Sequence, residues 1–408
     1  MSGLRVGFDL GTTSLAGRLW DESGQSLAEA SLDNPQQVFG ADVILRLAAA
    51  QQGACDPLQR QLCTGINVLL EQLLKQAGCR AAQIGLAAAA ANPAISHFLA
   101  GQPVEPILSP PHRPSYFAGE QLDSALLGLK LPVPLYLLPL VSGYVGGDLL
   151  ALLLGSPPAT GPTLYVDLGT NAELALWDGT HWQVTSVAAG PAFEAGNLAC
   201  GMRYAHGAVS EVKILKERFT LTVAGGGVPQ GICGSGLFAA LSAALQAGLI
   251  TADGRIRAAD EVDSSLSRYL VADDEANALQ LYRDARTCLR ISQADLRAFQ
   301  LAKGAVLAGV TCLLQRAGLA AGQLESVRIA GALGGALPVA ALKGVAILPE
   351  IVLDRCRFLP GGVLDGLLVQ MQARSGGKLA EELAANIKVY PLSGTPAFEK
   401  AFLASLDF

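Results

Sequence analysis

The sequence contains few charged residues and no excess of basic ones. Its 408 residues include 29 Lys and Arg against 35 Asp and Glu, so the formal net charge is −6, and charged residues make up only 16% of the chain. Proteins that bind nucleic acid need clustered Lys and Arg to contact the phosphate backbone, and the sequence has no such cluster. We therefore expect no nucleic-acid partner.

Long uninterrupted apolar runs are also missing. Hydrophobic residues account for 51% of the chain, but Asp148, Pro139 and glycine pairs break the apolar stretches before they reach the ~20 residues of a membrane span. The first residues lack the basic and apolar segments of an export signal. The sequence thus predicts a cytoplasmic protein without a membrane partner.

The cysteines are scattered. None of the eight is in a C-x₂-C or C-x₄-C spacing with another, so local sequence offers no metal or iron–sulfur site. In a cytoplasmic protein we expect them to remain thiols, and we expect no iron–sulfur cluster.

The length and the order of predicted elements indicate two lobes of an α/β fold. A single core stops growing well before 408 residues, and strands alternate with helices along the chain. Residues 156–162 (S-P-P-A-T-G-P) cannot continue the apolar helix before them. We therefore place the first lobe, which includes a proline-rich excursion, at residues 1–158 and the second at residues 159–408.

One short motif occurs twice, at residues 9–13 (D-L-G-T-T) and 167–171 (D-L-G-T-N), each time after an apolar strand. A glycine corner lets backbone N–H groups and threonine hydroxyls donate to phosphate oxygens, and an aspartate at the strand end can hold hydrated Mg²⁺. One copy fits an ordinary hairpin turn equally well, but two copies, one opening each lobe, favour a triphosphate clamp. The predicted phosphate-binding residues are Gly11, Thr12, Thr13, Gly169, Thr170 and Asn171, and the predicted Mg²⁺ ligands are Asp9 and Asp167.

A third glycine corner, residues 331–335 (G-A-L-G-G), follows a later strand. Its bare backbone could accept a nucleoside base and ribose, and a simple strand-to-helix turn is the alternative. The order of two phosphate corners and one adenosine corner resembles the actin, sugar-kinase and heat-shock ATPase (ASKHA) superfamily. This resemblance implies two ribonuclease-H-like lobes with ATP in the cleft between them. The implied adenosine-binding residues are Gly331, Ala332, Gly334 and Gly335.

The superfamily pattern also has a helix between the corners that carries an acidic residue into the cleft. The matching residue is Asp148, which follows residues 143–147 (G-Y-V-G-G) at a predicted helix start. The resemblance implies that Asp148 is catalytic and orients the water that attacks the γ-phosphate. A helix N-cap is the alternative role for an aspartate at this position.

Several longer segments point to one branch of the superfamily. They are residues 34–44 (N-P-Q-Q-V-F-G-A-D-V-I), 91–93 with His97, 138–148, 189–194 (A-G-P-A-F-E), 200–203, 231–236 and 300–303 (Q-L-A-K). Together they resemble the reductive activators of corrinoid-dependent methyltransferase proteins. The resemblance implies an ATPase that drives reduction of an inactivated Co(II) corrinoid, carried by a partner protein, to Co(I).

The sequence departs from this branch in its electron supply. The plant-type ferredoxin domain of the family does not precede the first corner in these 408 residues, so we expect a separate ferredoxin-like donor. Cys200 and Cys233 lie in glycine-flanked loops, and the related activators of 2-hydroxyacyl-CoA dehydratases hold a cluster between two subunits with two Cys from each. A homodimer of that kind is the alternative to two small buried thiols, which we favour because C-x₂-C context is missing.

We therefore predict an ATP-binding and ATP-hydrolysing activator of a corrinoid protein or another low-potential metalloprotein. Two alternatives stay open. In a small-molecule kinase, Asp148 would be the general base for a substrate hydroxyl, although no segment between residues 91 and 134 identifies a substrate pocket. The other alternative is a regulatory ATP-binding module without turnover.

Overall fold

The computed structural model describes residues 3–157, 159–196, 198–273, 276–331, 337–359, 361–373 and 378–408. The chain divides into two compact units, which we call unit 1 (residues 1–159 and 359–389) and unit 2 (residues 160–358 and 390–408). The first boundary is one residue after the predicted one. Residues 359–389 differ from the prediction, because helix α9 (Gly362–Gln372) packs against strands of unit 1 rather than against the lobe in which its sequence position placed it.

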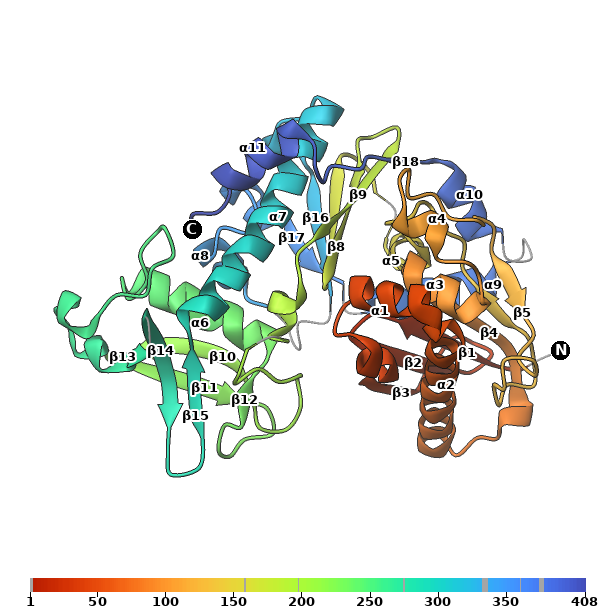
Figure 1. Ribbon diagram of the computed structural model, residues 1–408, viewed down its shortest axis with the longest axis horizontal. Helices are drawn as coiled ribbons and strands as arrows, with labels where there is room; N and C mark the ends of the chain where they lie inside the picture. Colours follow the sequence, from red (N-terminus) through yellow and green to blue (C-terminus); the bar gives the residue numbers. More distant parts are fainter. Residues whose placement is uncertain are drawn as a thin grey trace. The chain divides into compact units, whose positions relative to one another are not determined.

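Unit 1 is built on a sheet whose described strands follow the order β3-β2-β1-β4-β6-β5 (Figure 1). Strands β1 to β3 form an antiparallel meander, and β4 and β6 continue the sheet parallel to β1. Successive strand residues point to opposite faces, so Phe8 and Leu10 point to one face and Gly7 and Asp9 to the other. The strands are β1 (Leu4–Leu10), β2 (Ser14–Trp20), β3 (Ser26–Asp33), β4 (Ile84–Ala91), β5 (Glu120–Leu122) and β6 (Leu135–Leu137).

Helices cover both faces of this sheet. Helix α2 (Cys55–Ala77) packs on β2 and β3, where a Cβ added to Gly17 would lie 3.1 Å from the Leu73 side chain. Helices α5 (Gly147–Gly155) and α9 cover the face of Asp9, and they approach so closely that a Cβ on Gly366 would lie 1.7 Å from the Ala151 carbonyl oxygen. The remaining elements of unit 1 are η1 (Pro35–Phe39), α1 (Val43–Ala49), η2 (Ala50–Ala54), η3 (Ala81–Gln83), α3 (Pro93–Ala100), α4 (Glu105–Leu108), α10 (Leu379–Ala385) and β18 (Ile387–Val389).

Unit 2 contains a sheet in which its strands follow the order β17-β16-β7-β8-β9. Strands β7, β8 and β9 repeat the antiparallel meander, and β16 and β17 are parallel to β7. Helix α7 (Gln293–Ala317) covers the apolar face, where Gly309 lies against Leu174 and Val187. The strands are β7 (Thr163–Leu168), β8 (Asn171–Trp177), β9 (Trp182–Ala188), β16 (Ser326–Ala330) and β17 (Cys356–Phe358).

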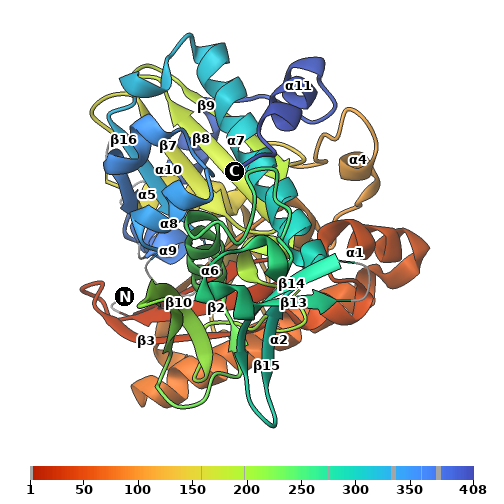
Figure 2. The same ribbon diagram turned by 90° about the vertical axis from the view of Figure 1, so that its left-hand side faces the viewer.

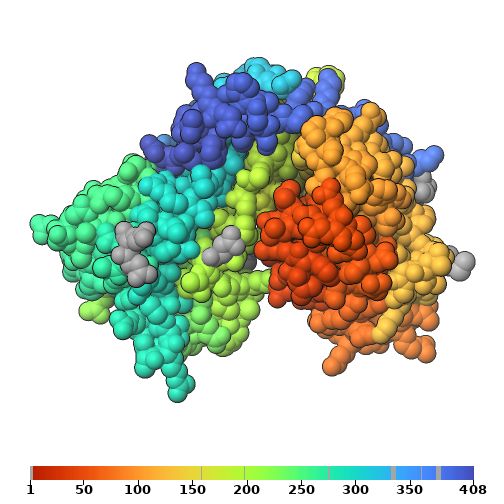
Figure 3. All heavy atoms as spheres, viewed as in Figure 1, coloured from red at the N-terminus to blue at the C-terminus, as the bar shows by residue number. Residues whose placement is uncertain are grey.

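Helix α7 is long and apolar enough to cross a membrane by length and composition, a feature that we did not expect from the sequence. In its most apolar window, 72% is buried inside the structure. Helix α11 (Pro396–Ala404) packs against it, and Figure 3 shows the C-terminal residues in dark blue lying against the cyan surface of α7. Its packing identifies α7 as the central core helix of unit 2.

Between β9 and α7 the chain forms an insertion. It contains two sheets of order β11-β10-β12 and β13-β14-β15, with helix α6 (Gly234–Gln246) packed on β10 (Figure 2).

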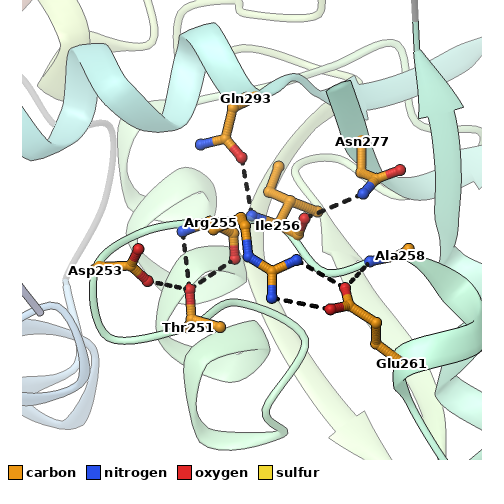
Figure 4. A network of polar contacts seen from close by, with 8 residues as sticks. All are labelled: Thr251, Asp253, Arg255, Ile256, Ala258, Glu261, Asn277 and Gln293. Atoms are coloured by element: carbon orange, nitrogen blue, oxygen red, sulfur yellow. Dashed lines mark hydrogen bonds and ion pairs between the residues drawn. The ribbon is translucent and has the colours of Figure 1, made fainter. Parts of the chain in front are cut away.

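A polar network joins residues 251–261 to the start of α7: Arg255 donates two hydrogen bonds to Glu261, at 2.7 and 3.0 Å, and Gln293 accepts from the Ile256 N–H at 2.9 Å (Figure 4). The insertion strands are β10 (Ala208–Leu215), β11 (Arg218–Val223), β12 (Gly231–Ile232), β13 (Leu270–Asp273), β14 (Ala276–Arg283) and β15 (Cys288–Ile291). The short helices of unit 2 are η4 (Pro191–Glu194), η5 (Ala259–Glu261), η6 (Ser265–Tyr269), η7 (Ala321–Gln323), α8 (Val339–Gly344) and η8 (Glu350–Arg355).

The two units repeat one connectivity beyond the short motif. In each, a long helix ends at a left-handed glycine, Gly78 or Gly318, and a single 3₁₀ turn leads into a strand parallel to the first. The turn is closed by a glutamine side chain, because Gln83 accepts from the Arg80 N–H and Gln323 from the Ala320 N–H, both at 2.7 Å. The predicted α/β fold of two similar lobes is confirmed.

Candidate functional site

The first corner follows β1 in unit 1. Its turn is closed by the Gly11 N–H, which donates to the Ser14 carbonyl at 2.9 Å, and a Cβ on Gly11 would lie 2.9 Å from that same oxygen. A side chain here would have to displace backbone, so the turn requires glycine. Asp9, one residue before the end of β1, lies on the sheet face that α5 and α9 cover. The Thr12 residue is 7% exposed.

Two buried asparagines hold this corner, each followed by a proline at the first helical position. Asn34 caps η1, donates from Nδ2 to the Gly11 carbonyl at 2.8 Å and from its backbone N–H to the Thr13 carbonyl at 3.0 Å. Asn92 caps α3 by accepting from the Ile95 N–H at 3.1 Å, and donates from Nδ2 to Thr12 Oγ1 at 3.0 Å. Both lie in segments that the sequence singled out, but their convergence on one corner is visible only in the fold.

The bond from Asn92 fixes how the Thr12 hydroxyl can be used. A hydroxyl has one hydrogen to donate and two lone pairs to accept with. Because Asn92 has only N–H hydrogens at Nδ2, Thr12 Oγ1 must be the acceptor in this contact. The hydrogen of Thr12 therefore stays available for an acceptor outside the corner, as a phosphate contact would require.

Asp148 lies in the first turn of α5, and Gly146, not Asp148, is the N-cap of that helix. The Asp148 carboxylate accepts from the Leu149 N–H at 2.9 Å, and burial raises the pKa of Asp148 to about 6. Helix α5 begins beside the end of β4, since a Cβ on Gly146 would lie 2.3 Å from the Ala91 carbonyl oxygen. Asp9 pairs with Ala90 of β4, so Asp9 and Asp148 are brought to the same edge of the sheet.

The second corner follows β7 in unit 2. Asp167 lies directly across from Glu173 of β8, and Asn171 is the first residue of that strand. The Thr170 carbonyl accepts from the Gly190 N–H at 2.8 Å, and the Thr170 hydroxyl donates to Glu194 Oε1 at 3.3 Å. Neither Glu173 nor Glu194 was predicted to have a role, although Glu194 is the last residue of one of the family-like segments.

The third corner begins at Gly331, directly after β16. Ala330 pairs with Asp167, so this corner starts at the same sheet edge as the second. Gly331 has a φ of 125°, and a Cβ there would lie 2.3 Å from the Leu168 carbonyl oxygen, so a side chain is excluded by both conformation and space. Ala332, Gly334 and Gly335, which were also predicted to bind adenosine, lie outside the described residues.

A groove of about 470 Å³ also lies in unit 2. This groove is bounded by β10, α6 and the start of α8. Its lining is mainly aliphatic, with Ser242 and Gln246 as polar groups on α6. The lining residues are Glu211, Val212, Lys213, Ile214, Leu215, Ala239, Ser242, Ala243, Gln246, Ala247, Pro338, Ala340 and Ala341. Sequence reasoning missed this groove because its walls come from three separate segments.

Cys200 and Cys233 are buried thiols that contact backbone carbonyls. The Cys200 thiol donates to the Arg290 carbonyl at 3.1 Å, and burial raises the pKa of Cys200 to about 11. Cys233 precedes α6 and donates to the Val209 carbonyl at 3.3 Å. This environment fits the favoured interpretation of two small packed thiols.

The family-like segment 300–303 contacts the residues that follow helix α11. Gln300 donates to the Leu406 carbonyl at 3.2 Å, and the Lys303 ammonium donates to the Asp407 carbonyl and lies 5.2 Å from the Phe408 ring centre. Lys303 has no exposed surface, and burial lowers its pKa to about 8. The two side chains attach the residues after α11 to the core helix.

The sequence matches two protein-family descriptions along nearly its whole length. Residues 4–157 match the "RACo middle region", and residues 161–408 match the "C-terminal domain of RACo the ASKHA domain". The corrinoid activation enzyme RamQ of Eubacterium limosum is 30% identical over 422 residues, which cover 99% of this chain and 70% of that protein. A Co(II) methylated amine-specific corrinoid protein reductase of Methanosarcina barkeri is 39% identical over 77 residues, 18% of this chain and 14% of that protein.

The fold matches as well as the sequence. The solved structure of a reductive activator for a corrinoid iron–sulfur protein superposes with a TM-score of 0.92 at 26% identity, over 100% of this chain and 66% of that one. The present chain thus spans slightly less than two thirds of that activator. The resemblance inferred from the sequence motifs is confirmed. With both the middle region and the ASKHA domain present, the chain belongs to the RACo family of corrinoid reductive activators.

Proposed function

We propose that this protein binds ATP with Mg²⁺ and hydrolyses it to support reductive activation of a corrinoid protein, with the electron supplied by a separate ferredoxin-like donor. The observation that carries the proposal is the pair of D-L-G-T corners, each at the end of a β-strand of a RACo-family chain. In the supported reaction, one electron converts Co(II) to Co(I) on the partner. Another low-potential metalloprotein is the alternative partner class.

The proposed nucleotide contacts follow from the corners. The first corner would hold phosphate through Gly11, Thr12 and Thr13, where Asn34 and Asn92 already fix the backbone and one hydroxyl. The second would hold phosphate through Gly169, Thr170 and Asn171. We place adenosine at Gly331 and in the groove between β10, α6 and α8, because the aliphatic walls of this groove suit a base and the Ser242 and Gln246 side chains can form hydrogen bonds.

Asp9 and Asp167 would hold Mg²⁺. The groups present fit this ion, because carboxylate and hydroxyl oxygens are the hard ligands that Mg²⁺ prefers, and Glu173 lies directly across from Asp167. Two carboxylates facing each other across strands repel unless a cation is near them. When bound, the ion neutralises charge on the triphosphate.

Asp148 would orient the attacking water. The water oxygen bonds to the γ-phosphorus while the bond to the bridging oxygen breaks, which gives ADP and phosphate and releases a proton. Phosphoryl transfer depends mostly on positioning and charge stabilisation. Asp148 lies in the first turn of helix α5, at the same end of the sheet as Asp9. The reductive step needs energy, since moving one charge across ~100 mV costs about 2.3 kcal/mol. ATP and ADP can supply it only if they favour different conformations.

The test combines nucleotide binding, hydrolysis and cobalt spectroscopy. Calorimetry should show Mg-ATP binding that is lost in Asp9→Ala and Asp167→Ala, with folding intact by circular dichroism. Asp148→Asn should bind normally but hydrolyse ATP about 10²–10⁴-fold more slowly, the usual worth of such a group. With a corrinoid protein and reduced ferredoxin, ATP should be needed for the Co(I) absorption band to appear.

Equal Mg-ATP binding by the parent and both aspartate variants would refute the clamp. Binding without hydrolysis would support the regulatory module instead, and phosphate transfer to an added small molecule would support a kinase. An Asp148→Asn variant with the parental rate would leave Asp148 with only its contact to the Leu149 N–H.

A further inference from the structure

A short loop of unit 2 folds onto the second phosphate corner and brings a carboxylate to it. The Gly190 N–H donates to the Thr170 carbonyl at 2.8 Å, and four residues later Glu194 Oε1 accepts from the Thr170 hydroxyl at 3.3 Å. A Cβ on Gly169 would lie 3.9 Å from the same carboxylate oxygen. Glu194 therefore faces the two residues that we assign to phosphate.

The loop is held firmly, so the position of Glu194 is set by the core. Phe193 is fully buried, and its ring lies 5.5 Å from that of Phe238 in α6 and 5.7 Å from that of Phe299 in α7. After Glu194 the chain turns back through Ala195, which adopts a φ of 56°. The anchor and the turn direct the next carboxylate away from the core and toward the corner.

A carboxylate at this place conflicts with a bare triphosphate. The negative charges repel each other, and the Thr170 hydroxyl has one hydrogen, which it cannot give to Glu194 and to a phosphate at once. A divalent cation removes both conflicts. It screens the repulsion, and its ligands or coordinated waters give the Glu194 oxygens new partners when Thr170 turns to the phosphate.

We propose that Glu194 makes the second corner selective for nucleotide that carries a divalent cation. Its carboxylate contacts the hydrated Mg²⁺ of Mg-ATP and repels metal-free ATP. This inference rests on the proposed function, because it assumes that the corner binds a triphosphate. The role proposed for Glu194 differs from those of Asp9 and Asp167, since Glu194 lies outside both D-L-G-T motifs. Glu194 also disfavours metal-free ATP in addition to favouring Mg-ATP.

The experiment measures the affinity for ATP by calorimetry, once with excess Mg²⁺ and once with EDTA, in the parent and in Glu194→Gln. The variant keeps the size of the side chain and removes its charge. We expect the ratio of the two affinities to fall about 10- to 100-fold, the worth of one charge-assisted hydrogen bond, through weaker Mg-ATP binding and stronger binding of metal-free ATP. Glu399→Gln, an exposed carboxylate on α11, is the matched control and should leave the ratio unchanged.

Two further variants separate the explanations. Thr170→Val removes the hydroxyl, and with it the competition for its hydrogen, but keeps the Glu194 charge, so it should lower the ratio by less than Glu194→Gln does. An equal fall in both variants would show that the effect runs through Thr170 alone, and the proposal would be wrong. Glu194→Asp keeps the charge and should preserve the preference for Mg-ATP, which keeps the test valid even if Glu194→Gln lowers the melting temperature. Parental Mg-ATP binding with an unchanged ratio in Glu194→Gln would overturn the role of Glu194. Failure of the parent to bind ATP would instead refute the proposed function.

Discussion

Substitutions of Asn92 can separate the stability of the first corner from its use in nucleotide binding. Asn92 makes two distinct hydrogen bonds, one that caps α3 and one that fixes the Thr12 hydroxyl. Serine can keep the cap but is too short to reach Thr12, alanine loses both bonds, and aspartate keeps the cap but cannot donate. The three variants therefore change the two bonds in different combinations.

The stability cost follows from these bonds. Losing an N-cap costs about 1 kcal/mol, and leaving a buried polar group without its partner costs about 1–3 kcal/mol. Asn92→Ala should thus lower the free energy of unfolding by about 2–4 kcal/mol in total, and Asn92→Ser by only the second part. Asn92→Asp should cost least, because the Thr12 hydroxyl can donate to the new carboxylate.

Nucleotide affinity should follow a different order. In Asn92→Asp the hydrogen of Thr12 is taken by the carboxylate, and a negative charge faces the phosphate site, so this variant should lose the most affinity for Mg-ATP. Asn92→Ala and Asn92→Ser leave the hydroxyl free to rotate toward phosphate and should lose less. The most stable of the three variants is therefore expected to be the weakest binder.

Urea unfolding and calorimetry on the same samples test this inversion. Asn67→Asp is the matched control, because Asn67 also donates from Nδ2 to a carbonyl of unit 1, that of Gly128 at 2.9 Å, but in a surface contact away from the corner. It should leave Mg-ATP affinity unchanged. If affinity and stability fall in the same order across the Asn92 variants, Asn92 acts on the corner only through folding and our reasoning about the Thr12 hydroxyl is refuted.

Two other predictions concern unit 2. Burial lowers the pKa of Lys303 from 10.5 to about 8, so between these pH values the unfolded chain binds more protons than the folded one. The free energy of unfolding should therefore rise by about 3 kcal/mol from pH 8 to 10.5. Urea unfolding of Lys303→Met should lack this rise, and equal pH profiles of the parent and the variant would contradict the lowered pKa. Gly331→Ala should lower stability by ~1–3 kcal/mol and weaken ATP binding, because its Cβ would meet the Leu168 carbonyl oxygen at 2.3 Å. Gly318→Ala, also at positive φ but with nothing within 4 Å of an added Cβ, is the control for backbone strain alone, and equal losses of stability in both variants would exclude the clash.

The sequence by itself determined the elements whose signals are local. Helix α7 has such signals at both ends: the Ser292 side chain caps its start and Gly318 ends it, and both residues are adjacent to the helix in the chain. The two D-L-G-T corners likewise follow their strands as predicted, since a strand, a glycine and a turn are adjacent in the chain. Family membership followed from the same short segments.

Tertiary structure alone decided which separate segments meet. Asn34 and Asn92 are 23 and 80 residues away in sequence from the corner residues that they contact, and Glu194 is 24 residues away from Thr170. Helix α9 belongs to unit 1 although residues 160–358 of unit 2 separate it from the first part of that unit. A single sequence has no local signal for such pairings, because they depend on how strands order in a sheet and which helix face is buried against it. The residues that brace the proposed site, and the groove assembled from β10, α6 and α8, could therefore be recognised only once the chain was folded.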